Sequence, residues 1–289
     1  MVKILVTGAN GQLGCELQKV SIKNPSMRYI FTDCAELDIT NANSVNAFFT
    51  LHKPDFLINC AAYTAVDKAE SDYENAMLIN AEAVANLAEA CKISNAVFFH
   101  ISTDYVFDGK TPAAYVETDS TNPVSVYGKT KLVGEKNALA YSKSIIIRTS
   151  WLYSSFGNNF VKTMLRLSSE RKNIKVVADQ TGSPTYAEDL AVAILKITEK
   201  IIENPQNMKT GIYNFSNDGQ CSWYDFAKEI IKLGNKNCLI EPVSTAEYPT
   251  AAQRPQYSLL SKEKIKTDYD VNIPHWKTSL ERCINQMKY

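Results

Sequence analysis

The first twenty residues constrain the fold of this chain more than any other stretch. An apolar run from Val2 to Thr7 is followed by three regularly spaced glycines (Gly8, Gly11 and Gly14) and by a helical pattern that continues to about Val20. Strand, glycines and helix in this order predict a dinucleotide-binding βαβ unit, because the glycines permit a tight turn, close approach of a pyrophosphate and close helix–strand packing. The N–H groups at the helix N-terminus would bind the phosphates. A glycine-rich turn that binds no ligand is the alternative interpretation.

Apolar strands continue to alternate with helices as far as residue 150. We expect four more strands, at residues 28–33, 55–61, 96–101 and 144–150, and a long amphipathic helix from about Tyr73 to Ile93. The run at 55–61 is nearly all apolar, which is typical of a strand covered on both faces. The alternation predicts an α/β protein with a Rossmann-like, doubly wound parallel sheet, and we assign residues 1–150 to a dinucleotide-binding domain.

Beyond residue 150 the alternation weakens. We expect helices at 160–170, 187–202 and 222–233 and strands at 174–177 and 211–216. This mixture predicts a smaller, mixed α/β lobe over residues 151–289 that mainly binds substrate, with some segments returning to the first domain.

Composition excludes several classes of function. Positive and negative side chains balance at 31 each among 289 residues, so no basic field predicts binding to nucleic acid or to an anionic membrane. No run of 18 apolar residues occurs and the chain starts directly on a strand, so we expect neither a signal peptide nor a membrane span. The seven cysteines are scattered, which indicates ordinary thiols of a cytoplasmic protein, none of them catalytic.

Two acidic positions after the second expected strand point to the adenosine half of a cofactor. Asp33 follows Gly14 by 19 residues, the distance at which a carboxylate meets the ribose hydroxyls and favours NAD over NADP. Asp38–Ile39 lies where the adenine would rest. Alternatively, Asp38 and Thr40 only begin a helix over residues 42–51.

The candidate catalytic pair is Tyr127 and Lys131. On a helix their side chains lie one turn apart on one face. A nearby ammonium favours phenolate, so we expect the pKa of Tyr127 to be lowered and the phenol to act as a general acid toward a carbonyl. The spacing alone is weak evidence, since Tyr224 and Lys228 share it.

Polar residues at the end of the fourth expected strand belong to the same region. Ligands bind beyond the carboxyl ends of strands in an open parallel sheet. The Thr103 hydroxyl is therefore placed to share a hydrogen bond with Tyr127 and to contact a substrate carbonyl, while Asp104 can orient substrate hydroxyls. A strand-end cap or turn is the alternative interpretation.

Several longer blocks carry a family resemblance. They are residues 59–70 (NCAAYTAVDKAE), 102–109 (STDYVFDG), 127–135 (YGKTKLVGE), 148–153 (RTSWLY), 157–160 (GNNF), 179–185 (DQTGSPT) and Arg254-Pro255. With the glycine fingerprint, they make the chain resemble the extended short-chain dehydrogenase/reductase superfamily, and within it the dTDP-4-dehydrorhamnose reductases. The resemblance implies reduction of the 4-keto group of dTDP-4-dehydro-6-deoxy-L-mannose (dTDP-6-deoxy-L-lyxo-4-hexulose) to dTDP-L-rhamnose, for cell-surface polysaccharide, with NADPH or NADH.

The resemblance also implies roles for individual residues. Cofactor contacts fall on Gly11, Gln12, Leu13, Asp33, Asp38, Ile39, Ala62, Tyr63 and Thr64, and Lys131 holds the nicotinamide ribose. Thr103, Asp104, Val66 and Trp151 contact the dTDP-sugar. Trp151 could instead be a core aromatic that joins the lobes.

Some members of the family bind Mg²⁺ at a homodimer interface through acidic residues. The corresponding positions here are Glu16 and Glu188. Two isolated carboxylates do not make a metal site by themselves, and surface salt bridges are the alternative.

Two rival functions share the catalytic pair. One is an epimerase or reductase acting on another nucleotide sugar. The other is a non-catalytic dinucleotide-binding subunit, because the regulatory subunit of methionine adenosyltransferase resembles the same family. The 148–151 segment and the 179–185 loop favour the enzyme.

Overall fold

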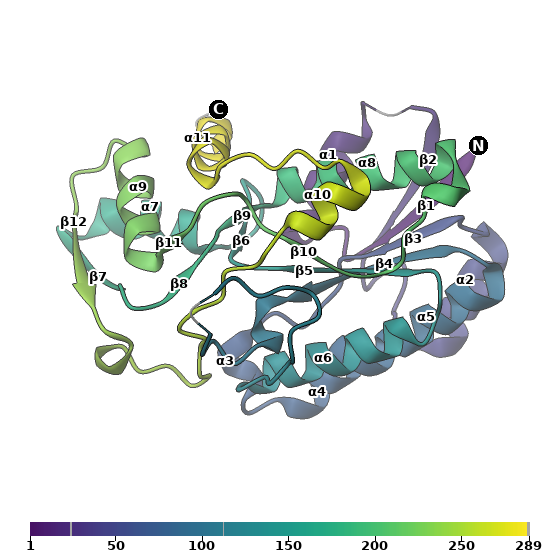
Figure 1. The fold of residues 1–289 in the computed structure, drawn as a ribbon, viewed down its shortest axis with the longest axis horizontal. Helices are drawn as coiled ribbons and strands as arrows, with labels where there is room; N and C mark the ends of the chain where they lie inside the picture. The colour runs from purple at the N-terminus through teal and green to yellow at the C-terminus, as the bar shows by residue number, and fades with distance from the viewer. Residues whose placement is uncertain (24, 112, 288–289) are drawn as a thin grey trace.

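A six-stranded parallel sheet organises the first lobe of the protein (Figure 1). The structure, a computed structural model, describes residues 1–23, 25–111 and 113–287. The strands are β1 (Val2–Thr7), β2 (Met27–Thr32), β3 (Phe56–Asn59), β4 (Val97–Thr103), β5 (Ser144–Thr149) and β10 (Gly211–Phe215). Their spatial order is β10-β5-β4-β3-β1-β2, so the direction of winding reverses beside β1 and β3. The predicted Rossmann-like, doubly wound sheet is confirmed.

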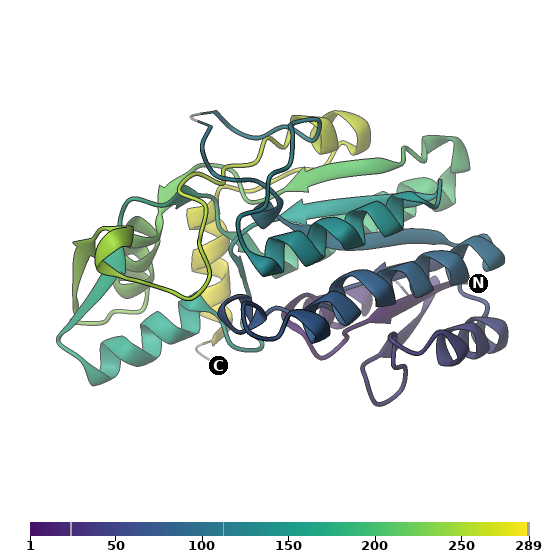
Figure 2. The ribbon, with the colours of Figure 1, turned by 90° about the horizontal axis from the view of Figure 1, so that it is seen from below.

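Helices cover both faces of this sheet. One face carries α1 (Gln12–Ser21), α8 (Ala187–Glu203) and α10 (Glu263–Tyr269), and the other carries α2 (Ala42–His52), α5 (Ala83–Ser94) and α6 (Val126–Leu139). Alternate residues of β1 pack against the helices on opposite faces of the sheet. Ile4 and Val6 pack with α1 and α8, whereas Leu5 packs with α2 and α5. Viewed from below, α5 and α6 lie side by side across the sheet (Figure 2).

The long helix expected over residues 73–93 is interrupted. It consists of α4 (Tyr73–Met77), a π-helical turn (Leu78–Glu82) and α5. The turn brings Asn80 into the interior, where its side chain accepts from the Tyr63 amide (2.9 Å) and donates to the Thr130 hydroxyl (3.1 Å). A π turn of this kind often marks a functional region, and this one ties the segment after β3 to α6.

The second lobe has a core of its own, built around α7 (Phe160–Glu170), α9 (Trp223–Leu233) and α11 (Trp276–Met287). Small sheets complete it: β7 (Asn173–Val177) pairs with β12 (Leu239–Val243), β6 (Leu152–Tyr153) with β9 (Thr185–Tyr186), and β8 (Thr181–Gly182) with β11 (Cys221–Ser222). The intervening α8 and β10, and later α10, pack on the first lobe. None of the helices in the described ranges is long and apolar enough to cross a membrane.

Candidate active site

A cavity of about 850 Å³ lies at the carboxyl ends of β1 to β5. It takes its walls from the residues that follow each strand and from the second-lobe segment 157–159. Most residues singled out in the sequence line it: Gly8, Gly11, Gln12, Leu13, Asp33, Asp38, Ile39, Ala62, Thr64, Val66, Thr103, Asp104, Tyr127, Lys131 and Trp151. Gly14 and Tyr63 do not.

The glycine turn has the geometry that a pyrophosphate requires. Gly8 has φ +67°, and a Cβ there would lie 2.6 Å from the Ala61 amide nitrogen. The Gly11 amide donates to the Gly8 carbonyl (3.1 Å), which closes the turn at the start of α1. A Cβ on Gly14 would lie 2.4 Å from the Gly8 oxygen, so Gly14 acts by packing the helix against the turn. These residues fit a dinucleotide cofactor.

Asp33 and Asp38 line the part of the cavity that lies beyond β2. The Asp33 carboxylate accepts from the Asn10 amide (2.9 Å). Asp38 accepts from the amide and hydroxyl of Thr40, and these hydrogen bonds lower the pKa of Asp38. Asn41, not Asp38 or Thr40, caps α2 by accepting from the Ser44 amide (3.1 Å). The interpretation of Asp38 and Thr40 as the start of the helix is therefore wrong, and Asp38 stabilises the turn that lines the cavity.

Tyr63 differs from its neighbours in the segment after β3. Ala62 and Thr64 line the cavity, whereas the Tyr63 hydroxyl donates to Asp72 (2.9 Å). Tyr63 therefore reaches a cofactor at most through its backbone, which Asn80 holds in place.

Tyr127 stands at the start of α6, where the helix touches the end of β4. A Cβ on Gly128 would lie 2.2 Å from the Tyr105 carbonyl oxygen, so glycine permits this approach. The Tyr105 ring packs edge-on against Tyr127, with centroids 5.4 Å apart. Thr103 lines the same cavity wall as Tyr127, and its hydroxyl acts to lower the pKa of the Tyr127 phenol.

The pKa of Tyr127 departs from expectation. Burial raises it to about 12, against a lowering effect of the Thr103 hydroxyl. The Lys131 ammonium, only 1% exposed, donates to the Ile101 carbonyl (2.7 Å), and burial lowers its pKa to about 8. The expectation that Lys131 lowers the pKa of Tyr127 is wrong for this structure, because burial of the phenol is the largest effect and the Asp104 carboxylate adds to it.

Asp104 is buried beside this pair, with 2% of its surface exposed. Its Oδ1 accepts from the Thr103 hydroxyl (3.0 Å), while Oδ2 has no partner. Burial raises the pKa of Asp104 to about 6, although hydrogen bonds from Ser258 and Thr103 oppose the shift. An unpartnered carboxylate oxygen in a cavity wall is suited to accept from a ligand hydroxyl.

Trp151 joins the two lobes and also lines the cavity. Its backbone has φ +48°, and its ring stacks on the Trp223 ring with the two centroids 3.7 Å apart. Trp223 lines a second cavity of about 670 Å³, to which Arg171, Lys175 and Arg254 contribute cations. Trp151 is therefore an aromatic residue that joins the lobes and lines the cavity, and its contact with the dTDP-sugar stays a prediction.

Comparison with known proteins places this geometry in one family. The model of the RmlD substrate binding domain matches residues 2–289. A dTDP-4-dehydrorhamnose reductase from Aggregatibacter actinomycetemcomitans is 44% identical over 288 residues, covering 97% of this chain and 98% of the relative. The chain belongs to this family.

Solved structures agree along the whole chain. A dTDP-4-dehydrorhamnose reductase from Clostridium acetobutylicum superposes with a TM-score of 0.94 at 45% identity, covering 100% of both chains. The dTDP-4-dehydrorhamnose reductase from Bacillus anthracis, in complex with NADP, superposes with a TM-score of 0.93 at 42% identity, covering 99% of this chain and 100% of that chain.

Three site residues escaped the sequence analysis. Tyr105 and Asn159 line the cavity, and the Asn159 side chain donates to Gln12 (3.0 Å), which ties the second lobe to the glycine turn. Arg254 forms a bidentate pair with Asp67 (2.8 and 3.1 Å) across the two lobes. These residues lie in the blocks that carry the family resemblance, but only the fold could bring positions so far apart in sequence together.

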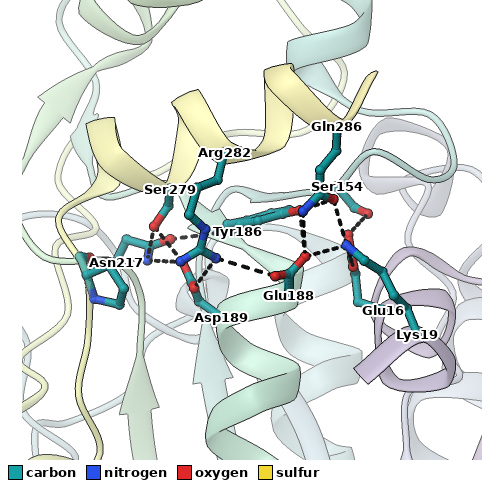
Figure 3. A network of polar contacts seen from close by, with 11 residues as sticks. Glu16, Lys19, Ser154, Tyr186, Glu188, Asp189, Asn217, Ser279, Arg282 and Gln286 are labelled. Carbon is teal, nitrogen blue, oxygen red and sulfur yellow. Dashed lines mark hydrogen bonds and ion pairs between the residues drawn. The ribbon is translucent and has the colours of Figure 1, made fainter. Parts of the chain in front are cut away.

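Glu16 and Glu188 lie away from this cavity, in a network that joins α1, α8 and α11 (Figure 3). Lys19 Nζ lies 2.5 Å from Glu188 and 3.6 Å from Glu16, and it also donates to Gln286 (2.6 Å). Glu16 is fully buried, which raises the pKa of its carboxyl. The expectation of surface salt bridges is therefore wrong for Glu16.

Within one chain, this network does not form a Mg²⁺ site. An ammonium already lies between the two carboxylates, and the described ranges contain no cluster of three or more His, Cys, Asp or Glu side chains suited to a metal. Mg²⁺ prefers several oxygen ligands without a cation among them.

Proposed function

We propose that the protein is a dTDP-4-dehydrorhamnose reductase, which reduces the 4-keto group of dTDP-4-dehydro-6-deoxy-L-mannose to dTDP-L-rhamnose. One observation carries the proposal: a chain that matches this family over residues 2–289 has Tyr127, Lys131 and Thr103 in the wall of one cavity beside the glycine turn. The product would serve cell-surface polysaccharide synthesis. The free thiols of all seven cysteines support a cytoplasmic location.

The cofactor half of the cavity is assigned to NADPH or NADH, which supplies the hydride when bound. The Gly8–Gly14 turn and the N-terminus of α1 hold the pyrophosphate through backbone N–H groups. Asp33 accepts from the adenosine ribose, and Lys131 binds the nicotinamide ribose. The Asp33 carboxylate favours NADH, yet the relative from Bacillus anthracis was solved with NADP, so we assign both cofactors.

Tyr127 is the proton donor in this proposal. A phenol with a pKa of about 12 is protonated at neutral pH, so a proton is available for the oxygen of the keto group as hydride arrives. Thr103 donates to the same oxygen and fixes its position. Lys131 stabilises the phenolate that remains after proton transfer.

The substrate spans both cavities. Asp104 and Val66 contact the sugar, with the free Oδ2 of Asp104 accepting from a ring hydroxyl. Trp151 contacts the sugar and leads through its stack with Trp223 to the second cavity. There, Arg171, Lys175 and Arg254 supply positive charge for the diphosphate, and aromatic rings supply a surface for the thymine base.

Oxidation of NADPH and NADH with enzymatically prepared dTDP-4-keto-sugar, beside the UDP and GDP counterparts, tests the proposal. We expect turnover with the dTDP sugar alone. Turnover restricted to another nucleotide sugar would identify a different reductase. Tight dinucleotide binding without oxidation of any sugar would favour a non-catalytic regulatory subunit.

A further inference from the structure

A third residue continues the stripe formed by Tyr127 and Lys131. Glu135 lies one turn beyond Lys131 on α6, so the three side chains follow at i, i+4 and i+8. Lys131 donates to the Ile101 carbonyl (2.7 Å), Glu135 accepts from the Ser102 hydroxyl (2.5 Å), and Tyr127 lines the cavity together with Thr103. The active-site edge of β4 is therefore held to α6 at two consecutive residues, Ile101 and Ser102, directly before Thr103.

Glu135 is anchored on both oxygens. Its side chain is buried, with 1% of the residue exposed, and it accepts from Arg148 Nε (2.9 Å) and Nη2 (2.7 Å). Arg148 lies over the Phe107 ring at 5.0 Å and is itself buried. A bidentate arginine fixes the plane and position of a carboxylate, so the negative charge beside Lys131 cannot swing away.

The charges that face Lys131 come from three elements. Glu135 on α6 favours the ammonium, as does Cys60 after β3, whereas burial disfavours it. His100 on β4 is buried, and desolvation and the Lys131 charge lower its pKa well below the ordinary value. Burial raises the pKa of Cys60 and raises that of Tyr127 to about 12. Of the two groups that favour the Lys131 ammonium, Glu135 and Cys60, only Glu135 is a carboxylate.

We propose that Glu135 is a positioning residue for the reduction, whose carboxylate, anchored by Ser102 and Arg148, keeps the Lys131 ammonium charged and in place beside Tyr127. The inference rests on the proposed function, because it gives Lys131 the task of binding the nicotinamide ribose. The functional motif is then Tyr-x-x-x-Lys-x-x-x-Glu. Removing the carboxylate would leave two buried cations, Lys131 and Arg148, with no anion between them.

The test compares Glu135→Gln with Glu135→Asp and the parent protein. NADH binding is followed by fluorescence between pH 6 and pH 9, and turnover is measured over the same range. The ammonium is present below the pKa of Lys131, so binding is lost as pH rises through about 8. Glutamine lowers that pKa. We expect affinity within about twofold of the parent at pH 6 and roughly tenfold weaker at pH 9, the effect of a shift of one pH unit.

Glu135→Asp keeps the charge and should restore the parental midpoint even if it weakens binding somewhat at every pH. A purely structural clamp predicts the opposite: both variants lose affinity equally across the range with an unchanged midpoint, and this result would overturn the inference. If Glu135→Gln does not fold, Glu135→Gln/Arg148→Gln removes both buried charges and should still show the lower midpoint. Binding needs no sugar substrate, so an inactive parent protein would refute the proposed function without obscuring this result.

Discussion

Two Tyr-x-x-x-Lys pairs occur in this molecule, and only one of them lies in a cavity. Tyr127 and Lys131 begin α6 at the carboxyl end of β4, where Lys131 is buried. Tyr224 and Lys228 begin α9 in the second lobe, where the exposed Lys228 ammonium lies 5.1 Å above the Tyr224 ring. The spacing brings both pairs together equally well. Whether a pair can act on a ligand therefore depends on the surroundings of the helix end that carries it.

The difference has a physical origin in the helix that carries each pair. On α6, Gly128 lets the helix start against the Tyr105 carbonyl, so the pair is pressed into the edge of the sheet. On α9, Phe226 and Ile230 are buried in the core of the lobe, Tyr224 is partly buried against that core, and Lys228 is exposed. An exposed cation above such a ring contributes about 0.5–1 kcal/mol to stability, and no ligand site lies beside it in the cavities described above.

The largest effect that separates the two pairs is expected from loss of a phenol oxygen. Tyr127→Phe should lower kcat by about 10²- to 10⁴-fold, the contribution of a positioned general acid, while the Kd for NADH stays within about twofold. The matched control is Tyr224→Phe, which should retain parental kcat. Equal turnover in the two variants would show that Tyr127 is not the acid.

Loss of the ammonium should give the next largest effect. Lys131→Met removes a charge-assisted hydrogen bond to the nicotinamide ribose, which is worth about 1.5–3 kcal/mol, so NADH should bind roughly 10- to 100-fold more weakly. Lys228→Met provides the control at the same helical position of the other pair. Calorimetric titration of both variants measures the difference, and equal affinities would remove Lys131 from the cofactor site.

Asp104 should show a smaller effect on turnover, coupled to stability. Asp104→Asn should reduce kcat/KM by about tenfold, because an amide cannot accept from a sugar hydroxyl at both of its polar atoms. The pKa of Asp104 is raised to about 6 in the folded protein, so ionisation opposes folding above that pH and not below about 4. The variant should therefore be more stable at pH 8 by on the order of 2 kcal/mol, with little gain at pH 4. Thermal melts at both pH values check the sign.

A lysine between carboxylates far from the cavity should have the smallest effect on turnover. Lys19→Met removes the cation shared by Glu16 and Glu188, and we expect a loss of about 1–2 kcal/mol in stability, since the ammonium is partly exposed. The kcat should change by less than about twofold. EDTA should alter neither kcat nor the melting temperature of the parent protein. Activity restored only by added Mg²⁺ would contradict the assignment of Lys19 as the cation of this network.

Local patterns in the sequence were sufficient for the sheet and for most of the cavity wall. The glycine fingerprint places Gly8 and Gly14 correctly because their roles depend on neighbouring backbone. Strand ends are equally local, so Thr103 and Asp104 could be placed at the carboxyl end of β4 from the apolar run that precedes them. The helix of residues 73–93 was predicted as continuous, since its apolar spacing does not reveal a π turn.

Features that depend on the tertiary environment could not be predicted. The pKa of Tyr127 rises because the fold removes the phenol from water, which no spacing encodes. Tyr63 turns toward Asp72, and Lys19 meets Glu188 across 169 residues. The partnership of Asp67 with Arg254 likewise depends on how the second lobe lies against the first.

Transfer of isotope tests the central claim most directly. The parent protein and Tyr127→Phe are each given dTDP-4-keto-sugar and NADH that carries deuterium at the transferable position, and the sugar is examined by NMR. We predict deuterium at C4 of the sugar from the parent protein and almost none from Tyr127→Phe, although both bind NADH. Deuterium at another carbon, or equal transfer by the two proteins, would contradict the assignment of this cavity and of Tyr127 to 4-keto reduction.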